Sequence, residues 1–95
     1  MAEEHAKYTL YVNNLSDQLS LEKLRENLFV FFSTFGQVVD VIVSPNTRGQ
    51  AFVLFAGVQD AKLALRSSQG EVLFGKPVQV AWAKEDAKKL ESLKG

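Results

Sequence analysis

Two hydrophobic periodicities alternate along this chain, and their order limits the folds that the chain can adopt. Residues 8–13 (Tyr-Thr-Leu-Tyr-Val-Asn) alternate as a half-buried β-strand does and are rich in strand-forming residue types. Residues 21–35 instead carry apolar side chains at helical spacing, with Ser20 as a candidate N-cap and Gly36 as a candidate C-terminal stop. The apolar stripe of this predicted helix consists of Leu24, Leu28, Phe31, Phe32 and Phe35.

The same two patterns recur in the remainder of the chain. Strands are predicted at residues 38–44, 50–55 and 76–84, and a second helix at residues 60–68. The order βαββαβ is that of the split-βαβ, ferredoxin-like α+β sandwich, in which two helices cover one face of a four-stranded antiparallel sheet. A chain of 95 residues is sufficient for one such domain with a single core.

The two ends of the chain differ in composition from this domain, which is expected at residues 8–84. Residues 1–7 are polar and are predicted to form a flexible N-terminal tail. Residues 85–95 are charged, with Leu90 and Leu93 spaced three apart, and form a predicted C-terminal helix or tail. A helix that covers the open face of the sheet and a solvent-exposed tail are equally consistent with this spacing.

Composition excludes several classes of function. The 11 Lys+Arg balance 11 Asp+Glu, so the formal net charge is zero and any nucleic-acid site must be a local one. The chain has no cysteine, and its one histidine, His5, lies in the predicted tail, so neither thiol chemistry nor a metal site is expected. No apolar run approaches the roughly 18 residues of a membrane span, and the first residues lack a signal-peptide pattern. A soluble intracellular domain without a membrane partner is therefore expected.

The face of the predicted sheet that carries no helix decides the function. Because the apolar residues of the first strand must face the core, alternation directs Tyr11 and Asn13 outward. The same argument directs Gln50 and Phe52 outward from the third strand, which neighbours the first in this topology. Two exposed rings surrounded by amides are typical of a platform on which unpaired bases stack. A one-residue shift of register would bury both rings and expose core residues instead. Those residues are Leu10, Val12, Val53 and Phe55.

The two outer strands contribute further side chains to this open face. Alternation directs Ile42 outward from the second strand and Gln79 outward from the last strand. The other residues expected to face outward are Asp40, Ser44, Ala81 and Ala83. Trp82 is expected on the core side, with Val78 and Val80.

Two segments on the central strands resemble known RNA-binding signatures. Residues 10–15 (Leu-Tyr-Val-Asn-Asn-Leu) resemble the hexamer of the RNA-recognition motif (RRM) family, and residues 48–55 (Arg-Gly-Gln-Ala-Phe-Val-Leu-Phe) resemble its octamer. Gln50 stands where the octamer usually has an aromatic residue. This glutamine, the adjacent asparagines and the runs Phe-Gly-Gln, Ala-Leu-Arg-Ser and Gly-Lys-Pro resemble one branch of the family, which holds the A protein of the U1 snRNP and the B'' protein of the U2 snRNP. The similarity extends over residues 8–86.

This resemblance implies a ligand and a set of contacts. The implied ligand is the single-stranded loop of an snRNA hairpin, U2 more than U1, bound in the nucleus for pre-mRNA splicing. Tyr11 and Phe52 are implied to stack on loop bases. Gln50 is implied to pack against a base as well, and Asn13 and Asn14 to bond base edges. The residues expected to contact RNA are Tyr11, Asn13, Asn14, Asp17, Ile42, Arg48, Gln50, Phe52, Lys76, Gln79 and Lys84.

This chain has fewer basic residues for contact with RNA than members of the family usually have. Arg48 is implied to sit where loop meets stem, Asp17 takes the place of a family acidic residue, and Lys76, Gln79 and Lys84 line the exit path. Three positions where the family's first loop usually carries lysines hold Gln18, Ser20 and Leu21. Only four basic residues remain as plausible phosphate neighbours, which predicts weak RNA binding by the domain alone. They are Lys7, Arg48, Lys76 and Lys84.

A second surface is predicted on the helices. Phe29 and Val30 lie off the core stripe of the first helix, and Leu63 lies off that of the second. Scattered surface apolar residues and a partner patch explain this equally well. The resemblance implies that a leucine-rich-repeat protein of the U2 snRNP docks there, which favours the U2 side of the branch. The alternatives are a U1 snRNA-binding A protein and an RRM used mainly for protein–protein interaction.

No catalytic arrangement is found, and no enzyme activity, cofactor or small-molecule substrate is expected. Small acylphosphate hydrolases share the predicted fold, but they need a Gly-rich anion cradle and an arginine after the first strand, where this chain has residues 14–18 (Asn-Leu-Ser-Asp-Gln). Residues 70–76 match the first seven positions of a phosphate-binding P-loop, but Pro77 stands at the eighth position, which requires Ser or Thr.

Overall fold

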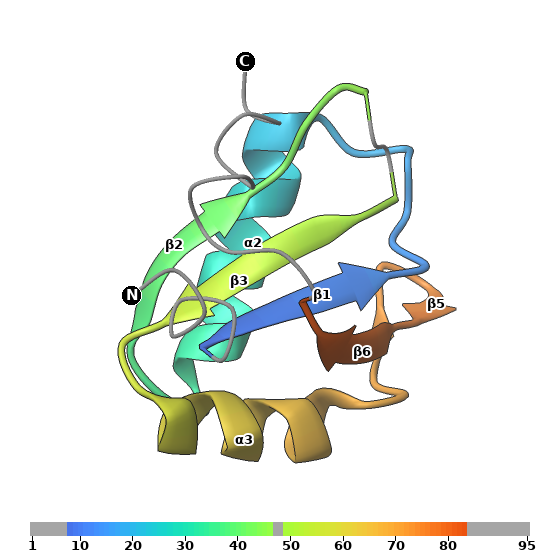
Figure 1. Ribbon diagram of the computed structural model, residues 1–95. Coiled ribbons are helices and arrows are strands. Elements are labelled where there is room, and N and C mark those ends of the chain that lie inside the picture. Colours follow the sequence, from blue (N-terminus) through green and yellow to red (C-terminus); the bar gives the residue numbers. More distant parts are fainter. Residues whose placement is uncertain (1–7, 47–48, 84–95) are drawn as a thin grey trace.

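A computed structural model of the chain describes residues 8–46 and 49–83 (Figure 1). The predicted N-terminal tail and the predicted C-terminal helix or tail lie outside the described residues, as do Arg48 and Lys84. Within the described ranges, no helix has both the length and the apolar character that crossing a membrane requires. In the same ranges, no three His, Cys, Asp or Glu side chains converge as metal ligands would.

The predicted ferredoxin-like sandwich is confirmed. The main sheet has four strands in the order β2-β3-β1-β6, and every neighbouring pair is antiparallel. Figure 1 shows α2 crossing behind this sheet, while the opposite face is turned towards the viewer. The elements in chain order are β1 (Thr9–Asn13), α2 (Leu21–Ser33), β2 (Val38–Ile42), β3 (Ala51–Phe55), α3 (Val58–Ser68), β4 (Val72–Leu73), β5 (Lys76–Pro77) and β6 (Gln79–Trp82).

One core lies between the helices and the sheet, and it uses the strand faces that alternation predicts. Leu10 and Val12 of β1 and Val53 of β3 are fully buried, and Phe55 is 2% exposed. The helices bury the predicted stripes against them, and the ring of Phe32 meets that of Phe55 edge-on at 6.2 Å between centroids. The helical residues buried in this core are Leu24, Leu28, Phe32, Ala61 and Ala64.

The start of α2 follows the sequence prediction, whereas its end has a different cause. Ser20 is the N-cap, and its Oγ accepts a hydrogen bond from the backbone N–H of Lys23 at 3.2 Å. The helix ends at Ser33, and Gly36 does not take the left-handed conformation expected of a helix stop. A Cβ on Gly36 would lie only 2.4 Å from the Cβ of Asp60. The glycine therefore permits close approach to α3, and its predicted role was wrong.

The last predicted strand is divided in two. Lys76–Pro77 pairs with Val72–Leu73 as a separate two-stranded hairpin, and β6 begins only at Gln79. Phe74 and Gly75 join the hairpin with φ angles of 54° and 84°, as a type I′ turn requires. Trp82 lies opposite Leu10 and hence on the predicted side, but it is 37% exposed because β6 is an edge strand. The predicted side of the sheet is therefore confirmed, but this edge position leaves the ring partly exposed.

Candidate nucleic-acid interface

The centre of the open face carries the predicted pair of aromatic rings. Tyr11 of β1 lies directly opposite Phe52 of β3, and both side chains are half-buried. Their ring centroids are 5.3 Å apart and their planes are inclined by 43°. The residues on either side of each ring along its strand are buried in the core. The register is therefore the predicted one, and the one-residue shift is wrong. The two inner strands thus present two neighbouring aromatic rings on one face.

Amide side chains surround this pair at one end of the sheet. Asn13, the last residue of β1, lies opposite the exposed Gln79 at the start of β6. Gln50 immediately precedes β3 and is half-buried. Each amide offers both a donor and an acceptor, as base edges do. The structure therefore brings together Tyr11 and Phe52 with all three of these predicted amides.

A small apolar cluster supports the rings on the same face. Ile42 lies opposite Phe52 and forms a cluster with Ala83, against which Tyr11, Phe52 and Leu54 pack. Ile42 is 1% exposed and Ala83 7% exposed. Ile42 thus supports Phe52 in this conformation, and its contact with RNA stays a prediction. Alternation did not predict the burial of Ile42 and Ala83, nor that of Ser44, which is 1% exposed, because it indicates exposure at outward positions.

The turn after β1 joins two other parts of the chain. Asn14 has a φ of 63°, and its Nδ2 donates a hydrogen bond of 2.7 Å to the carbonyl oxygen of Pro77. The next backbone N–H, that of Leu15, donates to the carbonyl of Gly49 at 3.0 Å. Gly49 has a φ of 83°, and a Cβ there would lie 3.3 Å from the Leu15 oxygen. The Asn14 amide is therefore already bonded within the protein. Its predicted contact with a base edge stays a prediction.

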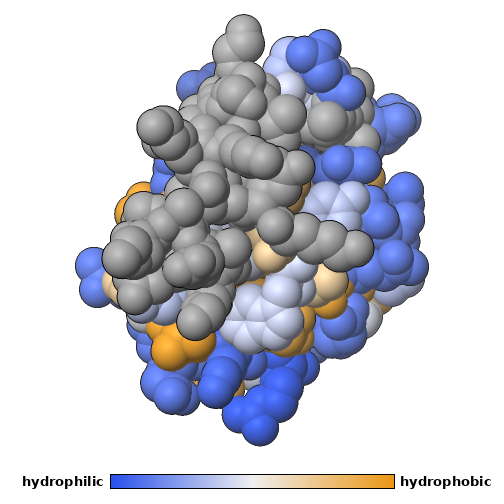
Figure 2. All heavy atoms as spheres, viewed as in Figure 1, coloured by the Kyte–Doolittle hydropathy of each residue, from blue (hydrophilic) through white to orange (hydrophobic). Residues whose placement is uncertain are grey.

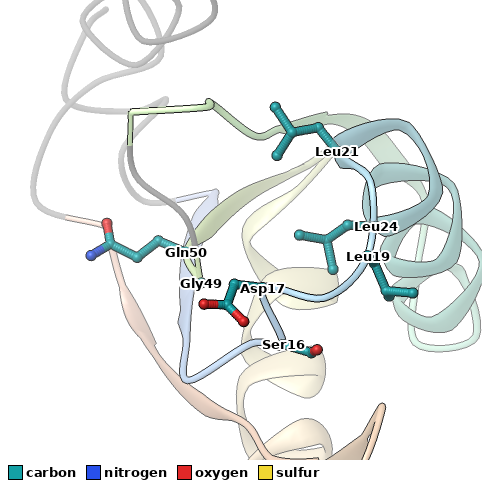
Figure 3. A pocket seen from close by; sticks show the side chains of 7 residues that line it. All are labelled: Ser16, Asp17, Leu19, Leu21, Leu24, Gly49 and Gln50. Atoms are coloured by element: carbon teal, nitrogen blue, oxygen red, sulfur yellow. The ribbon is translucent and has the colours of Figure 1, made fainter.

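Beside Gln50 lies a shallow hollow (Figure 3). The Asp17 carboxylate lies in it and accepts a hydrogen bond of 3.2 Å from the Gln18 amide. Figure 3 shows Gln50 pointing away from the leucines on the far side. A carboxylate only accepts hydrogen bonds, so Asp17 suits a base amino group better than a phosphate. The residues lining the hollow are Ser16, Asp17, Leu19, Leu21, Leu24, Gly49 and Gln50.

Positive charge in the described part of the chain lies mostly on the helices. Lys76 of β5 is the only lysine or arginine that the described strands and loops carry, and it is exposed. The helical ones are Lys23, Arg25, Lys62 and Arg66. Figure 2, viewed as Figure 1, shows pale and apolar residues in the part of the open face that is not drawn in grey, with hydrophilic residues to the right of them and below them. Among the described residues, aromatic rings and amides therefore outnumber positive charges on this face.

Comparison with known proteins identifies the family. The RNA recognition motif model matches residues 10–79, most of the chain, and the chain therefore belongs to the RNA recognition motif family. The fold agrees with a solved structure, the RRM3 domain of Mip6. It superposes with a TM-score of 0.71 at 23% identity and covers 83% of this chain and 96% of that one.

Within this family the chain belongs to the branch of the U1 A and U2 B'' proteins. It is 39% identical over 89 residues to the U1 small nuclear ribonucleoprotein A of Drosophila melanogaster, covering 92% of this chain and 41% of that protein. It is 38% identical over 87 residues to a probable U2 small nuclear ribonucleoprotein B'' of Schizosaccharomyces pombe, covering 90% and 78%. The U2 small nuclear ribonucleoprotein B'' of Dictyostelium discoideum is 35% identical over 89 residues, with 92% and 37% covered. The chain thus spans less than half of the Drosophila and Dictyostelium relatives.

Proposed function

We propose that this chain binds the single-stranded loop of an snRNA hairpin as the RNA-binding subunit of a nuclear spliceosomal snRNP that acts in pre-mRNA splicing. The observation that carries the proposal is the outward pair of Tyr11 and Phe52, with centroids 5.3 Å apart, in a chain of this branch. The protein is a binding module and not an enzyme in this proposal. It needs no cofactor.

The inclination of the two rings favours a loop over a continuous base stack. Bases stacked on Tyr11 and on Phe52 would be tilted by about the 43° between the ring planes. Successive bases in a helix are nearly parallel, whereas bases in an open loop can be splayed apart. Each stacked base contributes about 1–3 kcal/mol of binding free energy. The pair therefore suits two splayed bases of a single-stranded loop.

The polar side chains around the rings supply base recognition. Asn13, Gln50 and Gln79 each present a donor and an acceptor to base edges. Asp17 accepts a hydrogen bond from a base amino group, and Lys76 contacts a phosphate. Arg48 and Lys84 lie outside the described residues, and we assign them phosphate or stem contacts on the resemblance alone. Ile42 is assigned a contact beside Phe52 once RNA is bound, and Asn14 is considered further below.

A leucine-rich-repeat protein of the U2 snRNP is the proposed partner on the helices. Phe29 and Val30 of α2 are 41% and 69% exposed, and Leu63 of α3 is 44% exposed. Large apolar side chains left exposed on helices, away from the open face of the sheet, are suited to a protein contact. This proposal favours U2 snRNA as the ligand. The U1 hairpin is the alternative, since both kinds of relative are similar to this chain.

Fluorescence anisotropy with labelled U1 and U2 hairpins tests the ligand. A hairpin with the same stem and a scrambled loop is the control, and each titration is run with and without the leucine-rich-repeat partner. We expect the U2 loop to bind best and to bind more tightly with partner present. Preference for U1 would support the U1 alternative. Absence of binding to all three RNAs at low salt, even with partner, would identify a protein-docking RRM instead.

A charge on the helical patch tests the partner proposal. Val30→Glu places a carboxylate on the most exposed of the three patch residues, whereas Val72→Glu makes the same change at a similarly exposed residue of β4, outside the helices. We expect Val30→Glu to abolish the gain in RNA affinity caused by the partner, while Val72→Glu preserves it. RNA binding without partner should be unchanged in both. A full gain retained by Val30→Glu would remove Val30 from the partner surface.

A further inference from the structure

The end of β1 is fastened to a segment far away in the sequence. Asn14 donates from Nδ2 to the carbonyl oxygen of Pro77, 63 residues further along, at 2.7 Å. Its backbone has a φ of 63°, a left-handed conformation that asparagine and glycine tolerate better than other residues do. The side chain reaches Pro77 from this conformation. Asparagine thus combines two properties that this position requires, a tolerant backbone and an amide donor.

Pro77 belongs to a hairpin that is separate from the main sheet. The β4–β5 hairpin makes up its own two-stranded sheet, and Lys76 and Pro77 are its second strand. Two backbone hydrogen bonds fix the residue that follows. The N–H of Val78 donates to the carbonyl of Glu71 at 2.9 Å, and the carbonyl of Val78 accepts from Gly70 at 3.0 Å. These bonds join the hairpin to the end of α3. The Asn14 side chain joins it to β1.

The segment held in this way carries two of the proposed RNA contacts. Lys76 is the residue before Pro77, and Gln79 follows two residues after it and lies opposite Asn13. On the other side, Leu15 is bonded to Gly49, the neighbour of Gln50. The Asn14-Leu15 turn thus lies between the two chain segments that border the aromatic pair. A side chain fixed before the ligand arrives loses less conformational entropy on binding.

We infer that Asn14 is a positioning residue, which holds Lys76 and Gln79 in place beside the end of β1 and does not itself read a base. The inference rests on the proposed RNA-binding function. It differs from the expectation drawn from the resemblance, in which Asn14 bonds a base edge. The two assignments predict different patterns of RNA affinity.

A double-mutant cycle with Lys76 distinguishes these assignments. Asn14→Gly keeps the left-handed backbone and removes the amide donor. We expect it to weaken binding about three- to tenfold, by a similar factor for every single-base variant of the loop. In the Lys76→Ala background much of this loss should disappear, because residues that act through one another are not additive. Asn13→Ala is the matched control. As a proposed base reader, it should relax discrimination at one loop base and add to Lys76→Ala.

A measurement on the free protein tests the hydrogen bond without RNA. In the NMR spectrum, Asn14→Gly should shift the carbonyl carbon signal of Pro77 and speed amide exchange at Val78, while the amides of β3 remain unchanged. An unmoved Pro77 carbonyl would overturn this inference alone, and so would a loss of affinity confined to one loop base or fully additive with Lys76→Ala. Failure of the wild-type chain to bind any of the hairpins would overturn the proposed function, and this inference with it.

Discussion

Phe52 and Phe55 lie three positions apart on β3 and face opposite sides of the sheet. Phe55 is 2% exposed and contacts Phe32 in the core between sheet and helices. Phe52 is half-buried on the open face, where its neighbours are Tyr11 and Ile42. Residues of the same type on one strand thus have different surroundings: Phe55 belongs to the core, and Phe52 is proposed to bind the ligand. Their alanine variants should separate these roles.

Phe52→Ala should weaken RNA binding by about 1–3 kcal/mol, the value of one stacked base, and leave the fold intact. Phe55→Ala should lower the free energy of unfolding by about 3–5 kcal/mol, because it leaves a cavity in a packed core. Urea denaturation of both variants and anisotropy of Phe52→Ala with the preferred hairpin measure the two effects. If Phe52→Ala unfolded the domain and Phe55→Ala did not, the assignment of faces on β3 would be wrong.

Single residues also mark where sequence reasoning reaches its limit. Alternation predicts the faces of Tyr11 and Phe52 because each strand must bury its apolar side, and that constraint is local. The hydrogen bond from Asn14 to Pro77 spans 63 residues, and the steric need for Gly36 arises from Asp60 on another helix. Neither contact produces a periodic pattern in the sequence, because both depend on how separate elements pack against one another in the folded chain.

On the two edge strands of the sheet, side chains bond backbone groups that have no neighbouring strand. On β6, Gln69 accepts from the N–H of Val80 at 2.9 Å and donates to its carbonyl at 2.6 Å. On β2, the N–H of Val41 donates to the Asp40 carboxylate at 2.8 Å, and its carbonyl accepts from Nε of Arg25 at 3.1 Å. Unpaired strand edges favour pairing with other chains, and bonds of this kind occupy them. Both edges are thus less available for strand addition.

Gln69→Met should show how much the two hydrogen bonds between Gln69 and Val80 contribute to stability. Methionine keeps the length of the side chain but removes both hydrogen bonds, so we expect a loss of about 1–3 kcal/mol in the free energy of unfolding. Amide exchange at Val80 should become faster. Gln59→Met, at an exposed position of α3, the helix that Gln69 follows, is the control and should change neither quantity. Unchanged Val80 exchange in Gln69→Met would show that the side chain does not protect this edge in solution.

Prediction of the elements from the sequence fails at irregularities in the backbone. In β2, Val38 pairs with Phe55 and Asp40 with Leu54, so Val39 is an additional residue that forms a bulge and is 58% exposed. Uniform alternation cannot predict such an insertion. At the start of the last predicted strand, residues 76–84, Lys76–Pro77 instead pairs with Val72–Leu73 across the Phe74-Gly75 turn, in a hairpin too short to show a period. The order of elements and the inner strands remained predictable because they bury most of the core.

At the scale of the whole molecule, charge is distributed unfavourably for phosphate binding on the open face. The net charge is zero, and of the five Lys and Arg in the described residues, only Lys76 is outside the helices. The sequence adds Lys7, Arg48 and Lys84 as candidate phosphate neighbours. Affinity must therefore come mainly from stacking and hydrogen bonds, which salt screens less than contacts with phosphates.

The salt dependence of RNA binding measures this balance directly. Four phosphate contacts at about 0.7 each predict a slope of about −3 for log K against log salt concentration. Anisotropy titrations of the preferred hairpin over a series of NaCl concentrations give the slope. Lys76→Ala should make it shallower by about 0.7, because one phosphate contact is lost. A slope of about −6 or steeper would require about eight or nine phosphate contacts, which these four residues cannot supply. Such a slope would mean that cations on the helices also contact the RNA, and the open face would then be only part of the binding surface.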